Sequence, residues 1–199
     1  MIRGIVGING AGKTTYLRRR VGELERKKVR VGYLPDTPTI PVEVTALELL
    51  WRVGVMNGVA DAQQKATDLL DFLLIEDFDT QPVAHYSMGN YKKTALALTL
   101  LIPAQVMLLD EPLENLDAIS RKRAWAMFEQ MADRGTEFEI STQDFDIAMA
   151  CDHITVWADL QVVADGTPRD VLGRDPLRRL LELSQVDPSF RPPSWLGAR

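Results

Sequence analysis

Short apolar runs alternate along the chain with longer stretches in which apolar residues recur at helical spacing. This alternation is typical of an α/β fold, in which helices cover a mainly parallel sheet. The continuous apolar run at 106–109 fits a strand buried on both faces. The apolar runs predict strands over 2–8, 29–34, 106–109, 136–141, 154–157 and 160–164. The amphipathic stretches predict helices over 13–27, 45–53, 62–74, 87–102, 118–134, 145–150 and 168–183.

The length of 199 residues fits a single domain, 1–199, and is sufficient for a core without disulfides. A proline- and glycine-punctuated segment at about 40–85 predicts a short helical lobe, and the proline-rich tail at 187–199 an irregular end. Cys151 is the single cysteine, which excludes an intramolecular disulfide and a cysteine-built zinc site. The net charge of −5 argues against nucleic acid as the main partner.

The sequence also gives an expectation about membranes. The N-terminus shows no signal-peptide pattern. The longest apolar region, 95–109, is interrupted by Thr99, Pro103 and Gln105 and is shorter than the ~20 apolar residues that span a bilayer. We therefore expect a protein of a reducing compartment, with any membrane contact made through a partner.

Residues 7–15 read GINGAGKTT and fit the pattern G-x-x-x-x-G-K-[ST], between a predicted strand and a predicted helix. Glycines let successive backbone N–H groups approach phosphate oxygens, and the helix N-terminus adds a positive dipole end. Lys13 is expected to reach the β- and γ-phosphates, and the Thr14 hydroxyl to bind Mg²⁺. The other residues expected at the phosphates are Asn9, Gly10, Ala11, Gly12 and Thr15.

Asp110 and Glu111 directly follow the buried apolar run at 106–109. A carboxylate at the C-terminal end of such a strand is placed to hold a Mg²⁺ shell, which suits Asp110. Glu111 is placed to orient or deprotonate an attacking water. Without the phosphate-loop pattern upstream, a plain acidic strand end would explain the pair equally well.

The motifs at 7–15, 86–90 (YSMGN), 108–112 (LLDEP) and 115–117 (NLD) together resemble the ATP-binding subunits of ABC transporters. Ser87, Asp110 and Gln143 follow one another at intervals normal for that family, and the likeness runs from residue 2 to about 172. The string YSMGNYKKTALALTLL is closest in style to the cassettes of drug and bacteriocin exporters.

The resemblance implies a P-loop NTPase fold and a head-to-tail dimer with Mg-ATP between subunits. Ser87 and Gly89 of one subunit would face the Lys13 loop of the other, and Asp117 would lie at the dimer seam. Ser87 is also a helix N-cap candidate, and both roles can hold. The implied partners are an integral membrane subunit and a second ATP-binding subunit, identical or different. The implied location is the cytoplasm, on the inner face of the membrane.

Several positions depart from the family pattern. Asp36 stands where a glutamine is expected; its carboxylate is able to ligate Mg²⁺. Gln143 replaces the histidine of the switch loop; an amide can donate a hydrogen bond to phosphate but cannot take up a proton or a positive charge, so we expect slow hydrolysis. The antiparallel β-subdomain, with its adenine-stacking aromatic residue, is expected to be missing, which leaves the nucleotide base open.

Two functions remain from different classes. The first is the ATP-hydrolysing subunit of an export system; the second is a hydrolysis-poor ATP-binding switch or partner subunit in a heterodimer. A DNA-repair ATPase lacks support because no long coiled coil interrupts the helical lobe. Glu137 and Glu139 share one face of a predicted inner strand, where we expect an exposed face or a partner contact, with a catalytic carboxylate as the alternative.

Overall fold

The computed structural model describes residues 1–173 and 175–184. The chain divides into two compact units. The first comprises residues 1–3 and 14–141, and the second comprises residues 4–13 and the chain from 142 onward. Strand β1 (Ile2–Val6) contributes residues to both units. The predicted irregular tail at 187–199 lies outside the described residues.

The sheet of the first unit is parallel, and β3 (Val106–Asp110) is its central strand. It pairs on one side with β2 (Val31–Leu34), where Leu34 lies level with Leu109, and on the other with β4 (Glu137–Thr142). The start of β1 adjoins β4, since the Phe138 amide donates to the Met1 carbonyl at 3.0 Å. Every residue of β3 is buried, as its unbroken apolar run predicts.

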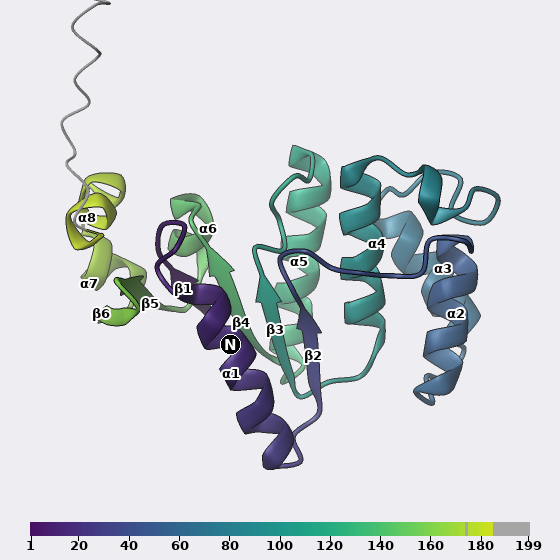
Figure 1. The fold of residues 1–199 in the computed structure, drawn as a ribbon, viewed down its shortest axis with the longest axis horizontal. Coiled ribbons are helices and arrows are strands. Elements are labelled where there is room, and N and C mark those ends of the chain that lie inside the picture. Colours follow the sequence, from purple (N-terminus) through teal and green to yellow (C-terminus); the bar gives the residue numbers. More distant parts are fainter. Residues whose placement is uncertain (174, 185–199) are drawn as a thin grey trace, which may run out of the picture. The chain divides into compact units, whose positions relative to one another are not determined.

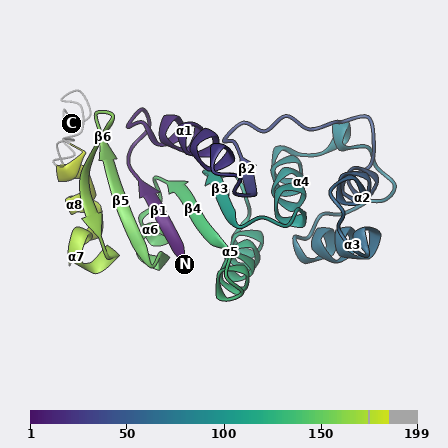
Figure 2. The same cartoon turned by 90° about the horizontal axis from the view of Figure 1, so that it is seen from below.

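Helices cover both faces of this sheet. Figure 2 shows α1 (Lys13–Arg26) on one face of β2, β3 and β4, with α5 (Ala118–Asp133) on the other. Under α5, the Phe128 and Phe138 rings lie 5.3 Å apart between centroids and are fully buried. The predicted α/β layering is therefore correct.

The rest of the first unit is helical and lies beside the sheet (Figure 1). Its elements are α2 (Ala46–Met56), α3 (Ala62–Phe72), the short 3-10 helix η1 (Val83–His85) and α4 (Met88–Leu101). Helix α2 packs on α3, and both contact α4. Helices α2, α3 and α4 occur where the sequence predicts them, with ends shifted by at most three residues, whereas η1 was not predicted. Within residues 1–173 and 175–184, no helix has the length and apolar character needed to cross a membrane.

In its described residues, the second unit contains the antiparallel pair β5 (His153–Ala158) and β6 (Gln161–Gly166) and three short helices. These are α6 (Phe145–Ala150), α7 (Pro168–Leu172) and α8 (Pro176–Leu183). The prediction of one helix over 168–183 is wrong. Helix α7 ends at Gly173, whose φ of +66° leaves the helical region, and α8 begins anew at Pro176.

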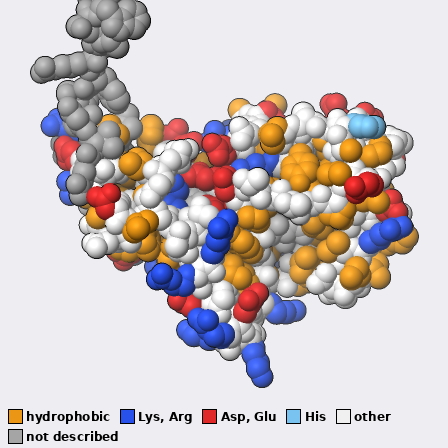
Figure 3. Space-filling model, viewed as in Figure 1, with side chains coloured by type: hydrophobic (Ala, Val, Ile, Leu, Met, Phe, Trp, Pro, Cys, Tyr) orange, Lys and Arg blue, Asp and Glu red, His pale blue; other side chains and the backbone are white. Residues whose placement is uncertain are grey.

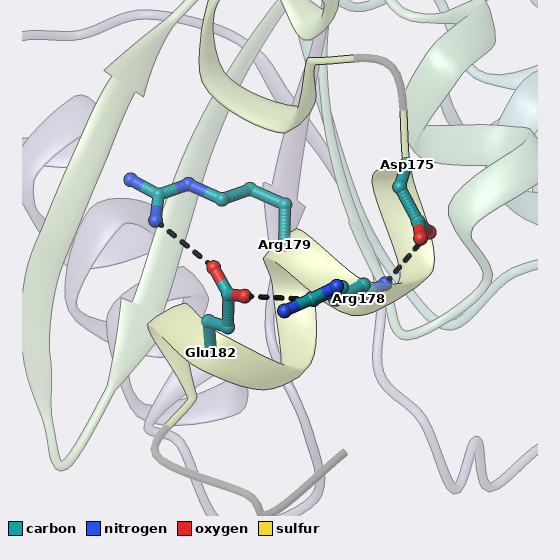
Figure 4. A network of polar contacts seen from close by, with 4 residues as sticks. All are labelled: Asp175, Arg178, Arg179 and Glu182. Atoms are coloured by element: carbon teal, nitrogen blue, oxygen red, sulfur yellow. Dashed lines mark hydrogen bonds and ion pairs between the residues drawn. The ribbon is translucent and has the colours of Figure 1, made fainter. Parts of the chain in front are cut away.

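Helix α8 has its own polar contacts (Figure 4). The Asp175 carboxylate caps it by accepting from the Arg178 amide at 3.2 Å. Glu182 pairs with the Arg178 and Arg179 side chains at 3.1 and 3.3 Å. Because all these groups are exposed, we expect them to contribute little beyond the cap.

Glu139 corrects the expectation of an uncovered polar face on β4. Its side chain is buried beneath α1, where it accepts from the Tyr16 hydroxyl at 2.7 Å and from Arg20 Nε at 2.9 Å. Burial, together with the bond to Glu139, raises the pKa of Tyr16, and the same carboxylate raises the pKa of Arg20. Glu139 therefore fastens α1 to the sheet, while Glu137 is exposed.

We expect Glu139→Ala to lower the free energy of unfolding by about 2 kcal/mol, because it leaves Arg20 and Tyr16 without their carboxylate. Glu137→Ala, on the same strand, is the matched control and should change it by less than about 0.5 kcal/mol. Urea unfolding followed by circular dichroism measures both. Equal stability of the two variants would show that the buried contacts of Glu139 contribute nothing to the free energy of unfolding.

Candidate functional site

The loop between β1 and α1 is closed around the Lys13 side chain. Lys13 Nζ donates to the carbonyls of Gly7 at 2.7 Å and Ile8 at 3.2 Å, and the residue is 6% exposed. The Gly7 amide donates to the Thr142 carbonyl at 3.3 Å, which anchors the start of the loop. Gly10 and Gly12 have φ values of +83° and +107°, which glycine adopts without strain.

The β5–β6 turn closes against this loop. A Cβ on Gly7 would lie 2.5 Å from the Trp157 carbonyl oxygen, so the loop requires glycine there. The Leu160 amide donates to the Ala11 carbonyl at 3.1 Å, and Leu160 also lies against Gly12. Asn9 and Gly10 remain exposed at the tip of the loop. This glycine-rich loop leading into a helix is the backbone arrangement that binds phosphate groups.

Gln143 is the exposed residue directly after β4. Its neighbours fix the backbone on both sides: the Asp144 amide donates to Thr142 Oγ1 at 3.0 Å, and Asp144 Oδ1 caps α6 by accepting from the Asp146 amide at 2.9 Å. The predicted switch residue thus stands between two fixed positions with its amide side chain exposed.

In the first unit, the Ser141 hydroxyl joins the two acidic residues at the end of β3. It donates to Asp110 Oδ1 at 2.5 Å and accepts from the Glu111 amide at 2.9 Å. The contact holds Glu111 at a φ of +45°, an uncommon conformation for a residue with a side chain. The sequence analysis missed Ser141; its register opposite Asp110 in the parallel pairing is the signal that reveals it.

The second carboxylate oxygen of Asp110 marks a place for a cation. Asp110 is 1% exposed, and its Oδ2 has no hydrogen-bond partner within residues 1–173 and 175–184. A buried carboxylate oxygen is costly unless something positive or protic meets it. Oxygen donors are the ligands that Mg²⁺ prefers, so Asp110 fits the predicted ion. In the described part of the chain, however, no three His, Cys, Asp or Glu side chains gather closely enough to hold a metal by themselves.

Asp36 was predicted as a further Mg²⁺ ligand. The structure places its half-exposed carboxylate 3.6 Å from Nζ of Lys92, a buried residue of α4. Thr14 is half-buried in the first turn of α1, and Thr15 beside it is exposed. Ligation of Mg²⁺ by Asp36 would therefore use the oxygen that does not face Lys92, or would break this ion pair.

Two helix N-termini carry the remaining predicted residues. Ser87 Oγ caps α4 by accepting from the Asn90 amide at 3.2 Å, as predicted. A Cβ on Gly89 would lie 3.3 Å from the Asn115 carbonyl oxygen, so the segment Ser87–Gly89 adjoins the loop before α5. Asp117 caps α5, and its hydrogen bond from the Ser120 hydroxyl is the main cause of its lowered pKa.

Comparison with known proteins decides the family. Residues 1–114 match the sequence model of the family described as ABC transporter. The chain belongs to this family, as an ATP-binding subunit. A putative ABC transporter ATP-binding protein of Listeria monocytogenes is 26% identical over 98% of this chain and 79% of its own length.

Two further ABC relatives have names that refer to drugs. The probable multidrug ABC transporter ATP-binding protein YbhF of Escherichia coli is 28% identical over 84% of this chain and 32% of its own length. The daunorubicin/doxorubicin resistance ATP-binding protein DrrA of Streptomyces peucetius is 28% identical over 93% of this chain and 63% of its own length. The chain thus spans about a third of one and less than two thirds of the other.

Solved ABC structures confirm the predicted fold class. The ATP-binding subunit of an ABC transporter superposes with a TM-score of 0.79 at 22% identity, covering 92% of this chain and 88% of that one. A dimeric ATP-binding cassette described in a post-hydrolysis state with ADP and Pi superposes with a TM-score of 0.71 at 18% identity, covering 83% and 84%. The likeness establishes a P-loop NTPase fold with a mainly parallel sheet and flanking helices.

Proposed function

We propose that this chain binds Mg-ATP and hydrolyses it to drive a separate membrane subunit of an export system. The observation that carries the proposal is the end of β3, where one oxygen of the buried Asp110 has no partner within the described residues and Ser141 holds the backbone of Glu111 beside it. A carboxylate free to meet Mg²⁺ next to a second carboxylate that orients water suits phosphoryl transfer to water.

Nucleotide binding would rearrange the contacts of the phosphate loop. Lys13 would exchange its bonds to the Gly7 and Ile8 carbonyls for the β- and γ-phosphates, and the loop amides with Thr15 would donate to the same oxygens. The Thr14 hydroxyl and Asp110 Oδ2 would hold Mg²⁺, with Asp36 as a third proposed ligand. When bound, Mg²⁺ neutralises charge that develops on the phosphates.

The proposed hydrolytic step depends on Glu111 and Gln143. Glu111 would accept a proton from the attacking water, while its backbone is held by Ser141. Gln143 would donate a neutral hydrogen bond to the γ-phosphate. Because a neutral donor stabilises the developing charge less than a protonated histidine does, we infer that hydrolysis is slow.

The exposed apolar residues beside the two helix caps support a dimer. Met88, next to Ser87, and Ile119, next to Asp117, are 72% and 62% exposed. Exposed apolar side chains rimmed by polar groups are typical of protein interfaces. A second ATP-binding subunit, identical or different, would cover them and bring Ser87 and Gly89 to the nucleotide held by the Lys13 loop of its partner.

The membrane partner would meet the helical lobe at about 40–85. Trp51, Val55 and Met56 of α2 are exposed, and Figure 3 shows hydrophobic side chains gathered over the α2–α4 part of the first unit. The lobe belongs to a proposed single ABC domain of 1–199. The drug-related names of DrrA and YbhF support an export role, with the chain located at the inner face of the membrane.

A second candidate function is a hydrolysis-poor switch or partner subunit within a heterodimer. Gln143 favours it, because an amide, unlike a histidine, does not take up a proton and become positively charged. The ion pair between Asp36 and Lys92 also favours this second function, because Lys92 engages a carboxylate that would otherwise be available to Mg²⁺. In that case the other ATP-binding subunit of the heterodimer would supply the site that is competent for hydrolysis.

We expect Glu111→Gln to reduce phosphate release from Mg-ATP about 100-fold, because an amide accepts no proton from water. Glu114→Gln, an exposed neighbour, is the control and should match the wild type. Release unchanged by Glu111→Gln would remove the catalytic assignment. ATP binding without release in the wild type would favour the switch.

We expect Gln143→His to raise kcat about tenfold with little change in KM, since a charged donor adds about 1.4 kcal/mol in the transition state. The control is Gln161→His, which adds a histidine at an exposed position of β6. Steady-state kinetics at pH 6.5 and 8 measures the gain, which should be larger at the lower pH, where histidine is charged. A variant no faster than the wild type would refute the inferred cause of slow hydrolysis.

A further inference from the structure

Two consecutive residues of α4 hold the segment that follows β2. The Tyr91 hydroxyl donates to the Pro38 carbonyl at 3.0 Å and accepts from the Ile40 amide at 3.1 Å. Next to it, Lys92 Nζ lies 3.6 Å from Asp36 Oδ1. We call residues 36–40 the post-β2 segment. Its two ends are thus tied to the same turn of one helix.

The post-β2 segment begins at the acidic edge of the sheet. The parallel register sets Leu34 level with Leu109, so Asp36 follows β2 at the edge where Asp110 ends β3 and Glu111 follows it. Burial raises the pKa of Tyr33, and the nearby carboxylates of Asp110 and Asp36 raise it further, which agrees with this placement. Asp36 therefore belongs to the edge that carries the proposed hydrolytic residues.

The other end of the connection is the start of α4. The Tyr91 amide donates to the Ser87 carbonyl at 2.9 Å, so Tyr91 and Lys92 lie one turn after the cap. Ser87 and Gly89, at that cap, are the residues proposed to meet a partner's nucleotide. The contacts of Tyr91 and Lys92 thus join the acidic edge to the first turns of this helix within one unit.

Because Lys92 is buried, its ion pair with Asp36 matters more for the stability of α4 than the 3.6 Å distance between the charged atoms suggests. Lys92 is 4% exposed, whereas the Asp36 side chain is about half exposed. A buried ammonium needs a nearby negative charge, and losing one partner costs more than losing both. Removing the Asp36 carboxylate should therefore disturb α4, and removing both charged groups should disturb it less.

We propose that the Asp36–Lys92 ion pair positions the first turns of α4 relative to Asp110 and Glu111, so that Lys92 is a positioning residue for hydrolysis. The proposal rests on the proposed ATPase function. In it, Asp36 acts through Lys92 in addition to any contact with the metal. A glutamine at position 36 would offer Lys92 no charge, so the pair is specific to the carboxylate found here.

The test is a double-mutant cycle on the purified chain with Lys92→Met, Asp36→Asn and the double variant. We expect each single change to lower kcat about tenfold, with KM for Mg-ATP changed less than threefold, and the double variant to be no slower than either single one. Lys92→Arg keeps the charge and should retain at least half of kcat. The matched control is Arg52→Met, which removes a cation from the exposed Arg52–Glu48 pair of α2.

Other kinetic results would overturn the proposal. A double variant slower than the singles by the product of their effects would show that the two residues act independently. A kcat for Lys92→Met within twofold of the wild type would show that Lys92 positions nothing. A higher Mg²⁺ requirement in Asp36→Asn, with Lys92→Met unaffected in every respect, would make Asp36 a metal ligand alone.

Amide hydrogen exchange separates failure of this proposal from failure of the ATPase function. The Ile40 amide, bonded to Tyr91, reports on the connection without any turnover. We expect exchange across 36–40 to accelerate at least about fivefold in Lys92→Met and to stay unchanged in Arg52→Met. If the wild type hydrolyses no ATP, this acceleration would support the connection while the ATPase function falls. Unchanged exchange in Lys92→Met would overturn the connection itself.

Discussion

Parallel pairing of β3 with its two neighbours is the constraint on which the chemistry of the first unit depends. In a parallel sheet the carboxyl ends of all strands meet at one edge, so Asp36, Asp110 and Ser141 follow or end strands at the same edge. Ser141 can reach both acidic residues of β3 because it lies level with Asp110. A slip of one residue in this register would turn the hydroxyl to the other face.

Among the buried polar groups of the first unit, Glu139 and Lys93 have hydrogen-bond partners, whereas one carboxylate oxygen of Asp110 has none within residues 1–173 and 175–184. Glu139 has Tyr16 and Arg20, and Lys93 Nζ donates to the Leu74 carbonyl at 2.6 Å, while burial lowers the pKa of Lys93. Such groups hold helices in place. Asp110 keeps a buried oxygen without a partner in the described chain, a state that stability alone does not favour.

The sequence predicts the helices and strands well because each depends on local information. Apolar runs indicate the strands, and the spacing of residues 7–15 predicts a phosphate loop, at a place where the structure has a glycine-rich turn between β1 and α1. Contacts between segments that lie far apart in the sequence are harder to predict. The cover over Glu139 comes from Tyr16 and Arg20, which lie four residues apart on α1 and so share one face. The pairing of Lys92 with Asp36 has no comparable local signal, because 55 residues separate the two in the sequence.

The break between α7 and α8, which the sequence analysis does not predict, has a different cause. Gly173 and Pro176 are both visible in the sequence and are the residues that end one helix and begin another. The continuous amphipathic pattern outweighed them in the prediction. Element ends therefore follow backbone chemistry more closely than apolar spacing does.

The proposed function requires that the loop around Lys13 bind the phosphates of ATP. The most direct test is calorimetric titration of the purified chain with ATP, with Lys13→Ala compared with Lys27→Ala, an exposed lysine directly after α1. We expect ATP to bind saturably to the wild type and to Lys27→Ala. We expect the affinity of Lys13→Ala for ATP to be at least about tenfold lower, as for the loss of one charge-assisted hydrogen bond. Equal affinity of Lys13→Ala and the wild type, or no saturable binding by either, would contradict it.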